Sequence, residues 1–307
     1  MTKISRYYPD AATRQQISRL SLTPMQAVDN RLRAQHASRR QGEGIEFHQY
    51  RPYQQGDDLR KVDWRLYGRS DRLYVREALQ DSRLTVTLMI DTSASMGLAD
   101  ANGVTRLEYA CRVAACLAWL ALVEQNDFAL IAVGGDVPRI LPPGQGRVHF
   151  ERFLKQLELL DAAGRWESQS VERILRRLPA NMLLIGLSDF FEHDREQTAA
   201  ISEITGRAHT AILMQLLLAK ELQFDERGQI EVVDGETGEK RLVSARRFRP
   251  TYLKAMHQLL QDTTRRHQAL GARVCRATTE TSVASLLRVA LNEQLPGSAR
   301  LLANVDL

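Results

Sequence analysis

The hydrophobic pattern of the chain is organised around the stretch from Leu84 to Met96, where an alternating segment becomes wholly apolar and then meets an acidic residue. A run of this kind predicts a strand buried within a sheet. Asp91 follows the apolar run, and Ser93 and Ser95 complete an Asp-x-Ser-x-Ser sequence. Open α/β sheets bind ligands at the carboxyl ends of their strands, so these oxygen-bearing side chains predict a site for a hard cation such as Mg²⁺. The alternative is that they only cap the next turn.

Apolar runs alternate with helical patterns along the remainder of the chain. This alternation predicts an α/β fold with a doubly wound, mostly parallel sheet between two layers of helices. Glycines at 134 and 135 predict a hairpin turn into a strand at 137–141, and turn residues between about 222 and 245 predict an inserted β-hairpin. The other predicted strands are 128–133, 181–189, 208–219 and 273–277, and the predicted helices are 105–124, 147–160, 171–178, 246–270 and 282–291.

A second acidic residue, Asp189, ends the apolar strand at 181–189. Strand ends of a doubly wound sheet lie side by side at one edge, so we expect Asp189 to lie beside Asp91.

Charge is unevenly distributed and sets the first 80 residues apart. They hold 15 Lys and Arg against 9 Asp and Glu, a net of +6, whereas the remainder holds 27 against 28, a net of −1. We therefore expect a small basic α+β module over residues 1–80, with helices within 10–40, and a main domain over 81–307. The polar start and the short apolar run at 113–123 predict a cytoplasmic protein with no membrane segment. The three cysteines, Cys111, Cys116 and Cys275, are expected to be free thiols.

Acidic and basic side chains crowd around a tryptophan in the basic module. Such a concentration of charged residues could form a catalytic cluster. We favour the interpretation that they form ion pairs which fasten residues 45–80 to the main domain. The cluster consists of Arg51, Asp57, Asp58, Arg60, Asp63 and Trp64.

The chain resembles the domain-of-unknown-function family fifty-eight. The resemblance is carried by Tyr50-Arg-Pro-Tyr, Gly56-Asp-Asp-Leu-Arg, Val62-Asp-Trp-Arg, Leu73-Tyr-Val-Arg-Glu and Asp91-Thr-Ser-Ala-Ser-Met. That family is similar to von Willebrand factor A domains and is commonly encoded beside MoxR-type AAA+ ATPases. The resemblance implies a three-layer von Willebrand A-like fold and a metal-ion-dependent adhesion site for Mg²⁺, with Mn²⁺ or Ca²⁺ as alternatives. It also places Asp189 as the distal metal aspartate and implies a chaperone-like adaptor.

One position departs from the metal site that the resemblance implies. Such sites add a threonine from a Gly-x-Thr loop, but here Gly164 is followed by Arg165 and Trp166, and an indole cannot ligate Mg²⁺. Ser168 or Glu167 could take over the role. Otherwise the site has only two anchors, the Asp-x-Ser-x-Ser loop and Asp189. It would then bind metal weakly, or only when a partner completes the coordination.

Three functions are compatible with the sequence. The first, which we favour, is a non-enzymatic adaptor that acts with a MoxR-type AAA+ ATPase, or binds a client protein, through an acidic side chain that completes the coordination of Mg²⁺. The second is a nucleic-acid adaptor using the basic module, although its arginines lack interleaved aromatic residues. The third is a Mg²⁺-dependent phosphatase of the haloacid-dehalogenase type. That chemistry needs an acid two residues after the nucleophile, where this chain has Ser93. The sequence contains no Walker A, zinc-spacing or dinucleotide motif, so we expect no enzyme.

Overall fold

The structure is a computed structural model, and it divides into two units, one of residues 26–83 and one of the remaining chain. Each unit is described by itself. The described residues are 5–22, 46–53, 62–70, 72–79, 85–134, 137–166, 173–174, 176–178, 182–191, 195–208, 210–224, 226–233 and 240–291.

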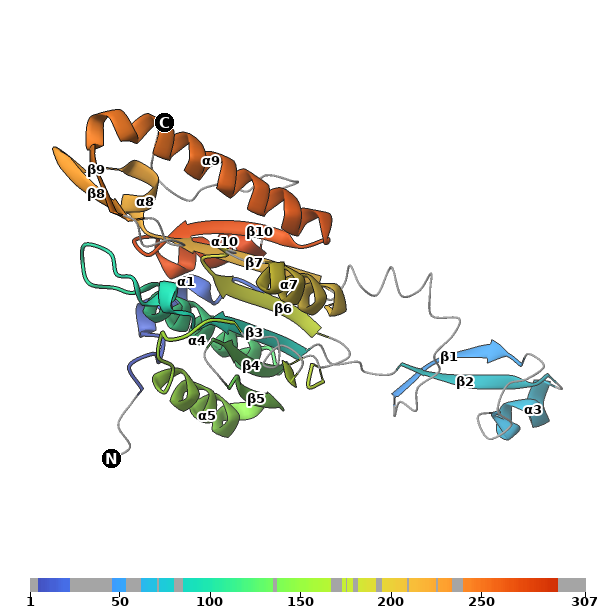
Figure 1. The fold of residues 1–307 in the computed structure, drawn as a ribbon. Coiled ribbons are helices and arrows are strands. Elements are labelled where there is room, and N and C mark those ends of the chain that lie inside the picture. The colour runs from blue at the N-terminus through green and yellow to red at the C-terminus, as the bar shows by residue number, and fades with distance from the viewer. Residues whose placement is uncertain are drawn as a thin grey trace. The chain divides into compact units, whose positions relative to one another are not determined.

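The larger unit is built on a six-stranded sheet with the order β10-β7-β6-β3-β4-β5 (Figure 1). All neighbouring pairs are parallel except β4 and β5. The chain starts in the middle of the sheet at β3 and winds first to one side and then to the other, which confirms the doubly wound, von Willebrand A-like plan. The strands are β3 (Thr85–Asp91), β4 (Asp127–Val133), β5 (Arg139–Gly144), β6 (Met182–Ser188), β7 (Thr210–Leu217) and β10 (Arg273–Thr278).

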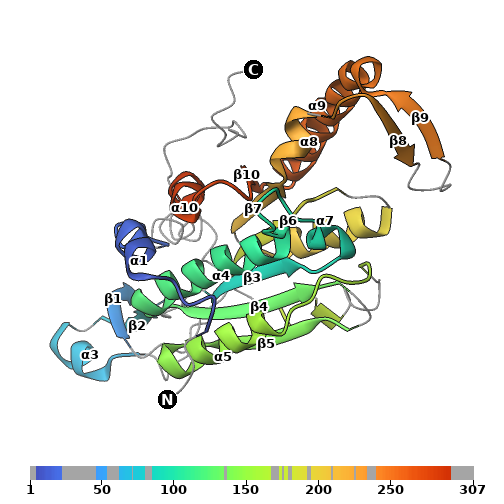
Figure 2. The same ribbon diagram turned by 90° about the vertical axis from the view of Figure 1, so that its left-hand side faces the viewer.

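Helices cover both faces of this sheet and complete three layers. One face packs against α4 (Arg106–Val123), which is flanked by α5 (Gly146–Glu158), α10 (Val283–Leu291) and the short α1 (Ala11–Ile17) (Figure 2). Helix α4 is apolar almost all round because these neighbours cover its sides. The other face packs against α7 (Arg195–Arg207) and the buried side of α9 (Ala245–Ala269).

Two further expectations about the larger unit are confirmed. Strands β8 (Gln229–Val233) and β9 (Lys240–Ser244) form an antiparallel pair between α8 (Ala219–Gln223) and α9, which is the inserted hairpin. All three cysteines are free and buried. Burial raises the pKa of Cys111 and Cys116 to about 12, which keeps both thiols protonated near neutral pH. The helix expected at 171–178 lies largely outside the described residues.

The first residues of the chain correct the expected start of the smaller module at residue 1, whereas its expected end at residue 80 lies close to the end of the smaller unit at residue 83. Ile17 and Leu22 are fully buried in the core of the larger unit, where α1 packs against α4 and α10. The backbone N–H of Leu22 also donates to Glu124 at 2.9 Å. Residues 5–22 therefore belong to the larger unit, because their apolar side chains complete its core. Of the helices expected within 10–40, the structure describes only α1, and residues 23–45 lie outside the described part.

The smaller unit combines an antiparallel pair of strands with one helix. Strands β1 (Glu46–Pro52) and β2 (Tyr74–Leu79) pair with each other, and α3 (Trp64–Ser70) precedes β2. The Asp63 carboxylate accepts hydrogen bonds from the backbone N–H groups of Arg65 and Leu66, at 2.9 and 3.1 Å. Asp63 is therefore the N-cap of α3.

Because each unit is described by itself, the fastening to the main domain stays a prediction for Trp64. Its side chain is 59% exposed, and its ring meets Tyr67 edge-on with centroids 6.2 Å apart. Of the remaining cluster, Arg51 lies in β1 opposite Val75. Asp57, Asp58 and Arg60 lie outside the described residues.

Candidate functional site

The two aspartates predicted for the site lie at one edge of the sheet. Strands β3 and β6 are neighbours in parallel register, and each carries its aspartate at its carboxyl end. Asp91 is 1% and Asp189 is 2% exposed. The Ser188 hydroxyl beside Asp189 donates to Asp91 Oδ2 at 2.6 Å. The sheet order thus brings the two carboxylates together at the point where the winding reverses, and the buried cluster that they form with their neighbours is called the crevice.

Both oxygens of Asp91 are already hydrogen-bonded. Oδ1 accepts from the backbone N–H of Ser93 at 2.8 Å and from the indole N–H of Trp166 at 3.0 Å, while Oδ2 accepts from Ser188. Burial raises the pKa of Asp91 above its usual range, and the nearby charge of Asp189 raises it further. Asp91 is therefore an enclosed anchor of the loop that follows β3.

Trp166 reaches Asp91 because its loop is joined to the Asp-x-Ser-x-Ser loop by backbone hydrogen bonds. Ala163 N donates to Thr92 O at 2.8 Å, and Ala94 N donates to Gly164 O at 3.1 Å. The indole thus fills the place where the threonine was expected and donates a hydrogen bond instead of offering an oxygen. Ser168 and Glu167, the two candidates for that role, lie outside the described residues.

The two serines of the motif lie next to each other at the edge of the crevice. Ser93 Oγ and Ser95 Oγ are 3.1 Å apart, and both residues are half-buried around η3 (Ala94–Gly97).

An arginine that the sequence reasoning missed completes the crevice. Arg106, at the start of α4, is 1% exposed. Its Nη1 donates to Asp189 Oδ2 at 3.3 Å and to the Ser95 carbonyl at 2.8 Å, and its Nη2 pairs with Glu221 of α8. One sequence feature could have indicated that Arg106 has a special role. It is a cationic residue in the first turn of a buried helix, where the helix dipole favours acidic side chains.

The donor set in this arrangement does not fit a divalent cation. Magnesium requires about six oxygen ligands in octahedral geometry. The oxygens of Asp91 are occupied by three donors, and Oδ2 of Asp189 faces a guanidinium. A cation placed there would be repelled by Arg106. In the described part of the chain, no group of three His, Cys, Asp or Glu residues could hold a metal ion.

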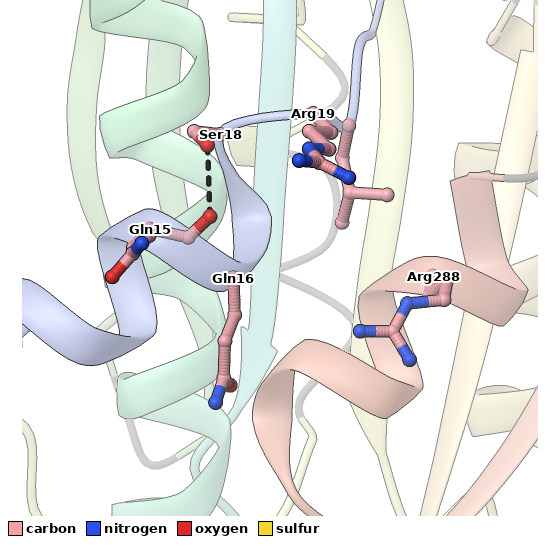
Figure 3. Close-up of a pocket in the computed structure, with 6 residues that line it drawn as sticks. Gln15, Gln16, Ser18, Arg19 and Arg288 are labelled. Carbon is pink, nitrogen blue, oxygen red and sulfur yellow. Dashed lines mark hydrogen bonds between the residues drawn. The ribbon is translucent and has the colours of Figure 1, made fainter.

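An open pocket of about 640 Å³ lies between α1 and α10, apart from the predicted site (Figure 3). Arg19, just after α1, and Arg288 of α10 bring two guanidinium groups to it. None of the lining residues belongs to the crevice. They are Gln15, Gln16, Ser18, Arg19, Leu20 and Arg288.

Comparison with known proteins identifies the family. Residues 49–262 match the family model described as "Protein of unknown function DUF58". The chain belongs to the DUF58 family. A curated relative, "Uncharacterized protein Rv1480" of Mycobacterium tuberculosis, is 27% identical to this DUF58 chain over 224 residues, which cover 71% of this chain and 69% of the relative.

Solved structures similar to this DUF58 chain are distant. The protein described as BatB from Bacteroides thetaiotaomicron is 13% identical with a TM-score of 0.39, over 67% of this chain and 95% of that one. The SpRpn10 VWA domain is 12% identical with a TM-score of 0.37, over 67% of this chain and 93% of that one. The fold therefore rests on the strand order described above. No helix among the described residues is long and apolar enough to cross a membrane.

Proposed function

We propose that this DUF58 chain is a non-enzymatic adaptor that acts with a MoxR-type AAA+ ATPase in the maturation or remodelling of other proteins, with α3 as its docking surface. The observation that carries the proposal is the exposure of Trp64 and Tyr67, at 59% and 39%. No residue of α3 is buried, although the helix contains two aromatic residues. Exposed aromatic residues and arginines are the residue types that dominate protein interfaces.

The charges on α3 indicate the chemistry of the partner surface. Arg65, between the two aromatic residues in the sequence, and Arg69 are exposed, and α3 contains no acidic residue. A partner surface that combines an apolar pocket with acidic side chains would complement this helix. Trp64 also belongs to the Val62-Asp-Trp-Arg motif, which lies within the residues matched by the family model.

The accessibility of Asp91 argues against a phosphatase. A carboxylate that attacks phosphorus must present a free oxygen to the substrate. Both oxygens of Asp91 are hydrogen-bonded and the side chain is 1% exposed. Ser93, at the position of the required acid, cannot donate a proton efficiently near neutral pH.

Titration calorimetry of the full chain with a MoxR-type ATPase encoded beside it, called the neighbouring ATPase, tests the proposal. We expect Trp64→Ala to weaken binding at least about tenfold, because truncating a central aromatic residue at an interface costs roughly 2 kcal/mol or more. Leu242→Ala, at an exposed apolar position of β9, is the control and should bind like wild type. Equal binding by the wild type and the Trp64 variant would contradict docking through α3.

Two other modes of action are separated by further arms of the same experiment. A mode in which the partner's acidic side chain completes a Mg²⁺ site at Asp91 and Asp189 requires binding to be lost in chelator, whereas docking through α3 requires equal affinity with Mg²⁺ and with chelator. A nucleic-acid adaptor would use Trp64 and Tyr67 to stack bases, and its affinity for a single-stranded oligonucleotide would fall steeply with salt.

A further inference from the structure

The Arg106 guanidinium is enclosed in the crevice at the strand ends. It is 1% exposed, and the ring of Phe191 lies 5.8 Å from its central carbon. Its two terminal nitrogens donate to the groups around it, and Nε has no hydrogen-bond partner in the described structure. A buried charge is tolerated only when opposite charges and hydrogen bonds compensate its lost hydration. The position of Arg106 is therefore set by the carboxylates around it.

The contacts of Arg106 join the ends of three neighbouring strands. Ser95 comes from the loop after β3, Asp189 follows β6, and Glu221 lies in α8 after β7. Glu221 is itself held, because its Oε2 accepts from the backbone N–H of Leu218 at 2.8 Å. One cationic group thus links the loops after β3 and β6, which the predicted cation would also link, and joins them to α8.

The buried carboxylates of the crevice need a positive charge to balance them, whether or not a metal ion is bound. Asp189 and Glu221 contact the guanidinium directly, and Asp91 accepts a hydrogen bond from Ser188, the residue before Asp189. Without Arg106, the carboxylates would repel one another in a buried site, where Coulomb interactions are stronger than in water.

We propose that Arg106 takes the place of a divalent cation in this crevice, so that the wild-type protein holds its strand-end loops together without metal. Removing the guanidinium should then uncover a site for a hard divalent cation. Its ligands would be the oxygens of Asp189 and Glu221, the Ser95 carbonyl that Arg106 now occupies, and the motif hydroxyls. This inference concerns a different site from α3 and does not depend on the proposed function.

Thermal unfolding of the full chain, followed by circular dichroism in chelator and in millimolar Mg²⁺ or Mn²⁺, tests the proposal. The wild type should have the same Tm in all conditions and bind no Mn²⁺ by electron paramagnetic resonance. Arg106→Ala in chelator should lose roughly 5–15 °C in Tm, because a buried carboxylate loses its partner. At a concentration about tenfold above its Kd, the cation should restore about 3–5 °C.

Two further variants keep the test decisive. Arg112→Ala removes an exposed arginine of the same helix, which pairs with Glu108, and should behave like wild type in every condition. Arg106→Lys keeps a cation in the crevice, so it should unfold at an intermediate temperature and remain insensitive to metal even if the alanine variant fails to fold.

Three results would overturn the proposal. The first is a wild type that Mg²⁺ stabilises or that binds Mn²⁺, with the binding abolished by Asp91→Asn. The second is an Arg106→Ala variant as stable as wild type in chelator. The third is a folded but destabilised Arg106→Ala variant that no divalent cation restores, which would make Arg106 a structural ion pair only.

Discussion

At the scale of single residues, the position of the acidic side chains could be predicted from the sequence, but the cation that balances them could not. Asp91 and Asp189 each follow an apolar run, and that local pattern is enough to place both carboxylates at one edge of a doubly wound sheet. Arg106 has no comparable signature, since its partners Asp189 and Glu221 lie 83 and 115 residues away along the chain. Such a contact is fixed only by the packing of α4 against the sheet, which periodicity does not describe.

The sequence shows that Trp166 stands in place of the expected threonine, but it does not reveal that its indole donates to Asp91. Replacing it with phenylalanine removes the N–H that donates to Asp91 Oδ1 and keeps an aromatic ring in the buried position. We expect the free energy of unfolding to fall by about 1–3 kcal/mol, because a buried carboxylate oxygen loses a donor. Trp64→Phe, at an exposed indole, is the matched control and should change stability by less than about 0.5 kcal/mol. Urea denaturation measures both, and equally small changes would show that the indole hydrogen bond does not hold the loop.

At the scale of elements, the sequence pattern was reliable wherever a strand or helix is covered on both sides. Helix α4 and strands β3, β6 and β7 are such elements, and each was predicted within a few residues of its observed bounds. The hairpin turn at residue 134 also predicted that β5 runs antiparallel to β4, as observed. The packing of α1 was not predictable, because its few apolar residues indicate a helix but not the surface that it covers.

The end of β4 passes so close to the Asp-x-Ser-x-Ser loop that only glycine fits at position 134. Gly134 has a φ of 151°, and a Cβ there would lie 2.5 Å from the carbonyl carbon of Thr92. The loop cannot easily move away, because Thr92 N donates to Val133 O at 2.7 Å. Gly134→Ala should therefore lower the free energy of unfolding by about 2–4 kcal/mol, from backbone strain and overpacking together.

A second glycine separates these two causes. Gly103 has a φ of 80°, and a Cβ there would meet no atom within 4 Å, so Gly103→Ala carries the backbone strain alone and should cost about 1–2 kcal/mol. Denaturation of both variants gives the comparison. Equal losses at the two positions would mean that the loop after β3 gives way to the added methyl group, and that the close approach is not a constraint.

At the scale of the whole molecule, composition indicated two parts and an end of the first near residue 80, close to the observed 83, but it placed the start of that part at residue 1 instead of residue 26. The net charge of +6 over the first 80 residues is shared between two units, since residues 1–25 hold 4 Lys and Arg against 1 Asp and residues 26–80 hold 11 against 8 Asp and Glu. Charge does not report burial, however, and Ile17 and Leu22 belong to the core of the larger unit. The smaller unit, residues 26–83, is therefore inserted between two segments of the larger one.

The two ends of this insertion meet at the same place in the larger unit. Leu22 N donates to Glu124, and Thr85 at the start of β3 pairs with Asp127 at the start of β4. The segment 124–127 thus holds both the exit and the return of the chain. A flexible linker of about ten residues spans roughly 15–20 Å, which should suffice to rejoin them.

We therefore expect that replacing residues 26–83 with such a linker leaves the larger unit folded, with a cooperative thermal transition within a few degrees of that of the full chain. Ile17→Ala in the full chain should instead cost about 2–4 kcal/mol, since it opens a cavity in the core. Calorimetric scans of both proteins measure the contrast. A separate module over residues 1–80 would give the opposite result, because Ile17 would then lie outside the core of the larger unit. The shortened chain should also fail to bind the neighbouring ATPase, because it lacks α3. A shortened chain that does not fold would show that the smaller unit contributes to the core, and one that folds and binds normally would place the docking surface on the larger unit.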